Sequence, residues 1–76
     1  MPASNMDIYL AGFNARSRNL LMAAGCNTLD DVVTIAEEGR LLDVDGCGPA
    51  LARNILWAIR NKTGKDLFLV NGVVPF

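Results

Sequence analysis

The stretch from Gly46 to Leu51 is the part of the sequence best suited to hold another molecule. Gly46 and Gly48 enclose Cys47, and Pro49 stands where a helix commonly begins. The two glycines permit a tight turn and a close backbone approach, and the N–H groups that open the following helix suit a phosphate. The alternative is a helical hairpin that serves only for packing, because a lone Gly-x-Gly pattern has little specificity.

A pair of polar residues lies nearer the N-terminus. Arg16 and Asn19 are three residues apart in a predicted helix over residues 15–24, so they share one of its faces. Asn14 is a good N-cap for that helix, and Gly25 is typical of a C-terminal cap. The two polar side chains therefore lie together near the N-terminal end of this helix.

Residues for catalysis are scarce. The chain of 76 residues contains no histidine, so neither Ser4 nor Ser17 has the usual general base. Asp43 and Asp45 flank a turn and would hold a magnesium ion only weakly. We therefore expect a protein that is not an enzyme, with no cofactor and no metal site.

Cys26 and Cys47 each follow a glycine and form no Cys-x-x-Cys pair. Their positions are those at which an apolar residue would pack. We expect two buried free thiols, with a disulfide as the less favoured alternative because it needs an oxidising compartment.

The elements that must position these residues are short helices. Thr28, with Asp31 three residues later, predicts a capping box at the start of a second helix. We expect a third, very short helix over residues 37–42. The last predicted helix begins at Pro49 and runs to residue 61 or 62. The predicted class is all-α: a compact bundle of four to five short helices with two helix-hairpin-helix-like motifs.

The two ends of the chain complete a single predicted domain over residues 1–76. Residues 1–12 are a lead-in segment, and residues 65–76 form an apolar tail. Because one strand has nothing to pair with, we expect the tail to be extended and packed on the helices.

The stretch from Leu41 to Ile55 resembles the helix-hairpin-helix motif. An apolar residue lies between Gly46 and Gly48, and Ala52 follows at the position where a small residue lets two helices pack closely. The full spacing, with its flanking aliphatic residues, is more specific than the two glycines alone.

The resemblance extends to the C-terminal domain of the bacterial RNA polymerase alpha subunit. In that family an Arg-Ser-x-Asn-x-Leu helix precedes a Gly-Ile-type turn and a Thr-x-x-(Asp/Glu)-Leu helix. The corresponding residues here begin at Arg16, Gly25 and Thr28. The similarity covers roughly residues 8–76 and is strongest over 13–33 and 41–59.

This resemblance implies binding to the minor groove of A·T-rich double-stranded DNA and contact with transcription regulators. Arg16 matches the arginine that enters the groove, Asn19 the asparagine beside it, and Gly48 the hairpin glycine whose backbone meets phosphate. Gly46 stands at the preceding hairpin position, which is often asparagine. A narrow A·T minor groove attracts an inserted arginine because its potential is strongly negative.

The sequence departs from the family just after the hairpin. Ala50 and Leu51 replace a lysine and a serine, and Pro49 removes one backbone donor. Losing a phosphate-contacting lysine weakens the electrostatic attraction to DNA. Arg18 and Arg53 are expected to lie next to the proposed face and to compensate in part.

Charge is distributed unevenly along the chain. The net charge is −1, from seven basic and eight acidic residues. Residues 30–45 carry six acidic residues against one arginine, whereas residues 46–76 carry four basic residues against one acidic residue. Near-neutrality therefore does not exclude DNA, but it limits the expected contact to a weak one.

A rival interpretation keeps the fold and gives it another partner. Leu56 and Trp57 point away from the main apolar stripe of the last helix and would form an exposed anchor for RNA polymerase or a transcription regulator. Alternatively, the apolar tail covers Trp57. We expect a cytoplasmic protein without a membrane partner, because no apolar run reaches about 18 residues and no signal peptide is present.

Overall fold

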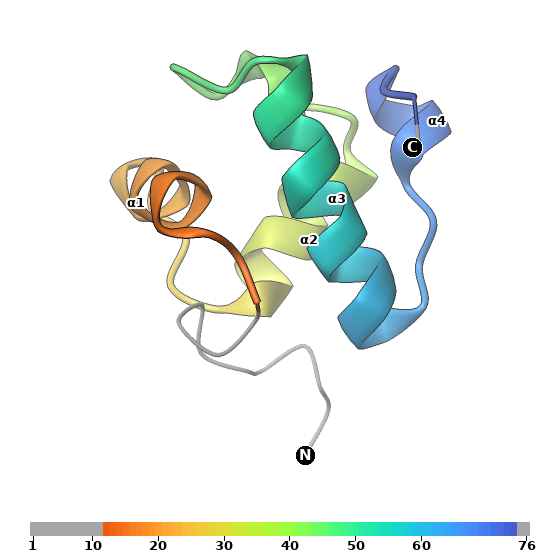
Figure 1. The fold of residues 1–76 in the computed structure, drawn as a ribbon, viewed down its shortest axis with the longest axis horizontal. Coiled ribbons are helices and arrows are strands. Elements are labelled where there is room, and N and C mark those ends of the chain that lie inside the picture. The colour runs from red at the N-terminus through yellow and green to blue at the C-terminus, as the bar shows by residue number, and fades with distance from the viewer. Residues whose placement is uncertain (1–11, 75–76) are drawn as a thin grey trace.

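A computed structural model describes residues 12–74 and confirms the predicted small all-α bundle (Figure 1). The predicted lead-in over residues 1–12 lies outside the described residues, except for Gly12. In chain order, the elements are α1 (Ala15–Ala23), α2 (Leu29–Glu37), the single 3₁₀ turn η3 (Leu41–Asp43), α3 (Pro49–Thr63) and α4 (Phe68–Asn71).

The first two helices begin at the predicted caps. The Asn14 side chain accepts a hydrogen bond from the Ser17 N–H at 2.8 Å. At α2, the Thr28 hydroxyl accepts from the Asp31 N–H, and the Asp31 carboxylate accepts from the Thr28 N–H, which completes the capping box. The Asp31 carboxylate also accepts from the Asn27 N–H at 2.9 Å. These backbone donors lower the pKa of Asp31.

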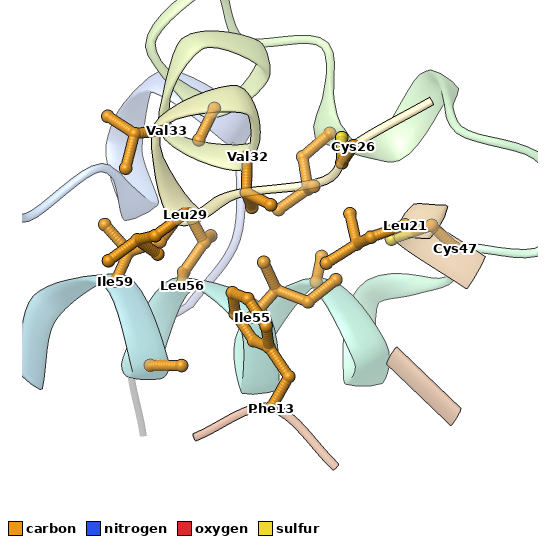
Figure 2. Close-up of a cluster of buried hydrophobic side chains, with 14 of the residues drawn as sticks. Phe13, Leu21, Cys26, Leu29, Val32, Val33, Cys47, Ile55, Leu56 and Ile59 are labelled. Atoms are coloured by element: carbon orange, nitrogen blue, oxygen red, sulfur yellow. The ribbon is translucent and has the colours of Figure 1, made fainter. Parts of the chain in front are cut away.

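Helix α3 runs through the middle of the molecule, with α1 on one side, α4 on the other and α2 behind it (Figure 1). Leu29 and Val32 of α2 face Ile55 and Leu56 of α3 in the core (Figure 2). The fully buried side chains in this core come from the three longer helices, from η3 and from the tail: Leu21, Leu29, Val32, Ala36, Leu41, Ala52, Ile55, Leu56, Ile59 and Phe68.

The predicted short helix over residues 37–42 is wrong in its position. Glu37 still belongs to α2, and Gly39 adopts a φ of +72° and donates its N–H to Ala36 O, which closes that helix. Only residues 41–43 then form a 3₁₀ turn, η3. The left-handed glycine separates the two elements.

The tail is packed on the helices as predicted, but the prediction that it is extended is wrong. The carboxylate of Asp66 accepts from the Phe68 N–H, and a helical turn, α4, follows. Phe68 is buried between α3 and α2, whereas Leu69 is 94% exposed. A short helix satisfies the tail's own backbone groups where no neighbouring strand exists to do so.

Asn71 fixes α4 to the rest of the molecule. Its Oδ1 accepts from the Leu41 N–H at 3.2 Å, and its Nδ2 donates to the carbonyls of Ala36 and Leu67, both at 2.9 Å. A Cβ at Gly39 would lie 2.9 Å from Val70 O, so only glycine permits this approach of the tail to the end of α2. This close contact and the Asn71 hydrogen bonds join the tail to the end of α2 and to η3.

Cys26 and Cys47 are buried free thiols, as predicted. Burial raises the pKa of both thiols, and the nearby Asp31 carboxylate raises that of Cys26 further. Both cysteines therefore pack as small apolar side chains near Leu21 (Figure 2). Among the described residues, no helix is long and apolar enough to cross a membrane.

Candidate nucleic-acid interface

The N-terminal half of α1 presents Arg16 and Asn19 to solvent. One turn further along the same face lies Leu20, which is half-buried. Ser17 points the other way and is fully buried, and its hydroxyl donates to Asn54 Oδ1 of α3 at 3.5 Å. The small serine thus lets α1 pack closely on α3 while Arg16 remains outside.

The hairpin between η3 and α3 reaches this same face of α1. The Cys47 N–H donates to Val44 O at 3.0 Å, and Gly46 adopts a φ of +82°. A Cβ on Gly46 would lie 3.2 Å from Leu20 Cδ1. The tip of the hairpin therefore packs against the residue that follows Asn19, one turn from Arg16.

Helix α3 begins without a side-chain cap. Gly48 is its N-cap and Pro49 its first residue, and no acidic residue occupies its first turn. In such a helix the N–H groups of Ala50 and Leu51 have no intrahelical partner. Gly48 and Ala50 are exposed, so this end of the helix offers donors and a positive dipole end to solvent.

Two arginines expected beside this face lie elsewhere, so that part of the prediction is wrong. Arg18 is about 200° around α1 from Arg16, and its Nε is buried. Arg53 donates its Nε to Val74 O at 3.1 Å, on the side of α3 that faces the tail. Helical periodicity alone separates Arg18 from Arg16, whereas the placement of Arg53 depends on where the tail runs.

Carboxylates adjoin the hairpin. Asp43 and Asp45 line a hollow of about 310 Å³ together with Leu20 and the exposed end of α1. Their negative charge opposes the approach of phosphate to Gly46. The sequence signals this only as an acidic stretch over residues 30–45, without showing that part of that stretch adjoins the glycine turn. Asn54, which joins α3 to α1, has no sequence signal at all.

The proposed protein anchor is also changed by the structure. Leu56 is 1% exposed and packs in the core, so its predicted exposure is wrong. Trp57 is half-buried, and its ring meets that of Phe68 edge to face, with 5.5 Å between centroids. The tail therefore covers part of Trp57, which was the alternative prediction.

The structure thus sets Gly46 beside Leu20, which lies one turn from Arg16 on α1, whereas Arg18 and Arg53 lie on other sides of α1 and α3. Within residues 12–74, no group of three metal-binding side chains is present. Comparisons with known protein families, with known proteins and with solved structures find no match.

Proposed function

We propose that the protein is a nonenzymatic DNA-binding module that docks in the minor groove of A·T-rich duplex DNA. Arg16 enters the groove, Asn19 bonds beside it, and the backbone at Gly46 and Gly48 meets phosphate. The observation that carries this proposal is the contact of Gly46 with Leu20, because it sets the hairpin beside the face of α1 that bears Arg16.

The chemistry of the two parts is complementary. A guanidinium group fits a narrow groove of negative potential, and uncapped N–H groups at the start of α3 suit the phosphates that border such a groove. Base-edge and phosphate contacts then come from separate elements, α1 and α3, held in register by the buried Ser17. A family resemblance to a transcription domain further supports a role in transcription, with RNA polymerase or a regulator as a second partner.

The proposed binding is weak and depends strongly on salt. One arginine and one helix start contact few phosphates, and Asp43 and Asp45 repel the duplex nearby. With about two to three phosphates contacted, the logarithm of the affinity falls with the logarithm of salt concentration with a slope of roughly −2 to −3. A stronger dependence would require more cations than this face contains.

Amide chemical shifts during titration with an A·T-rich duplex at low salt test the proposed docking. We expect the largest changes at residues 14–20 and 46–51, and small changes on α2 and α4. Titration with a G·C-rich duplex is the matched control and should give smaller shifts, because its minor groove is wider and carries the guanine amino group. Unmoved amides at both segments would refute the proposal.

A further inference from the structure

The side of α3 that faces the tail carries a surface that the proposed DNA contact does not use. Arg53, Trp57 and Arg60 follow at intervals of four and three residues, so they form one stripe along the helix. The tail lies beside them, with Phe68 against Trp57 and Val74 O bonded to Arg53. We name the surface formed by these side chains the α3–tail surface; it comprises Arg53, Trp57, Arg60, Phe68, Leu69 and Val74.

The apolar part of the α3–tail surface is a groove of about 470 Å³. It is lined by Phe68, Leu69, Val73 and Val74, with Asp66 at its edge. Leu69 is 94% exposed and Val74 is 56% exposed. Large aliphatic side chains exposed next to a half-buried tryptophan are typical of surfaces that bind proteins.

The charged part of this surface is mainly basic. The guanidinium carbon of Arg60 lies 5.0 Å from the centroid of the Trp57 ring, and Arg53 is held beside Val74 at the groove. The nearby Lys65 is already paired with Glu37 at 2.8 Å. Arg53 therefore lies at the edge of the groove, and Arg60 stacks on Trp57, whose ring contacts Phe68 in the groove wall. Among the described residues that line the groove, only Asp66 carries a carboxylate.

We propose that the α3–tail surface binds an acidic, aliphatic segment of a partner protein. The aliphatic side chains of the segment pack on Leu69 and Val74, and its carboxylates pair with Arg53 and Arg60. Duplex DNA matches this surface less well because its phosphates leave the aliphatic groups uncovered. The surface lies across α3 from α1, so this inference is independent of the proposed DNA contact (Figure 1).

A peptide titration tests the proposal on the whole chain. The probe is a short amphipathic peptide of Glu and Leu residues, and the matched probe carries Lys in place of every Glu. Trp57 is the only tryptophan, so its emission reports binding directly. We expect the acidic peptide to shift that emission with a Kd of about 100 µM, as suits a small groove. Equal binding of the basic peptide, or none by either, would overturn the proposal.

Variants on and off the surface locate the contact, with fluorescence anisotropy of labelled peptide as the readout. Leu69→Asp and Arg60→Glu should each weaken binding of the acidic peptide about 10-fold or more. Lys62→Glu is the control, because it makes the same charge change on α3 while Lys62 lies on the side that faces Gly12. Circular dichroism verifies that each variant is folded, and an equal loss with Lys62→Glu would contradict the assignment.

Two other results would assign the surface to a different partner and so refute the proposal. Concentration-dependent self-association that Leu69→Asp abolishes, without any binding of the acidic peptide, would show that a second copy occupies the groove. If Arg60→Glu loses as much duplex DNA binding as Arg16→Ala, nucleic acid binds the α3–tail surface.

Discussion

The chain contains two Gly-Cys turns with similar glycine conformations, but the helices that follow them begin differently. Gly25 and Gly46 have φ values of +95° and +82°, and the cysteine that follows each is buried. After the first turn, Thr28 and Asp31 cap the helix with their own side chains. After the second turn, Gly48 leaves the helix uncapped.

The contrast shows how similar turns can lead into two different helix starts. At the start of α2, two acidic residues in the first turn and the capping box satisfy the helix end and repel anions. At the start of α3, the equivalent donors remain for a ligand. The first turn therefore stabilises the fold, whereas the second leaves backbone donors exposed, as the proposed DNA contact requires.

Leu21→Ala should have the largest effect, because it disturbs both turns together. Leu21 is fully buried, its carbonyl accepts from the Cys26 N–H at 2.9 Å, and it lies near Cys47 (Figure 2). We expect a loss of about 3 kcal/mol in the free energy of unfolding, measured by urea denaturation. Met22→Ala, the exposed neighbouring position, should cost far less, and equal losses would contradict the packing described.

Replacing Gly25 or Gly46 with alanine distinguishes the stability cost of backbone strain from the cost of a steric contact. Gly25→Ala should cost about 1 kcal/mol from its positive φ alone, since nothing lies within 4 Å of a Cβ there. Gly46→Ala should cost slightly more, because the new Cβ presses on Leu20 Cδ1. Only Gly46→Ala should weaken binding to duplex DNA. If Gly25→Ala weakens it equally, the two turns do not differ in function.

Gly48→Asp gives α3 an acidic start like that of α2. The φ of Gly48 is −83° and no atom lies within 4 Å of its Cβ position, so aspartate fits without strain. We expect a gain of about 0.5 kcal/mol in stability, from thermal unfolding, together with loss of DNA binding. Gly48→Asn is the uncharged control, which should cap the helix and bind DNA more strongly than Gly48→Asp.

The smallest effect concerns pH. The pKa of Asp31 is lowered in the folded chain by the N–H groups of Asn27 and Thr28. A carboxyl group with a lowered pKa stabilises the fold above its pKa in the unfolded chain, and that contribution is lost as pH falls through the folded value. Stability should therefore decline below about pH 4. Asp31→Asn should flatten this decline in acid unfolding followed by circular dichroism.

Local signals in the sequence predict the helix boundaries well. Asn14, Thr28 and Pro49 each act through neighbouring residues, so the helices begin where the sequence predicts them. These features need no knowledge of how the elements pack. The pairing of Arg16 with the hairpin, in contrast, is expected only from the family resemblance, because it joins elements that are far apart in the sequence.

The errors in the sequence-based predictions arise from packing between distant elements. Leu56 is buried because α3 packs against α2 as well as against the tail, which widens its apolar face beyond one stripe. The tail folds into α4 because Asn71 finds partners on residues more than 29 positions away. Arg53 turns from the hairpin for the same reason, since Val74 O lies within its reach.

The central claim is that α1 and the uncapped hairpin bind duplex DNA, and one titration tests it most directly. A labelled A·T-rich duplex is titrated at about 50 mM and 200 mM salt with the wild-type chain, Arg16→Ala and Lys62→Ala. Lys62→Ala removes the same charge from the last turn of α3, at the end opposite the hairpin. We predict that Arg16→Ala weakens binding about 10- to 100-fold and Lys62→Ala less than about 3-fold. Equal affinities for wild type and Arg16→Ala, or equal losses in the two variants, would contradict the claim.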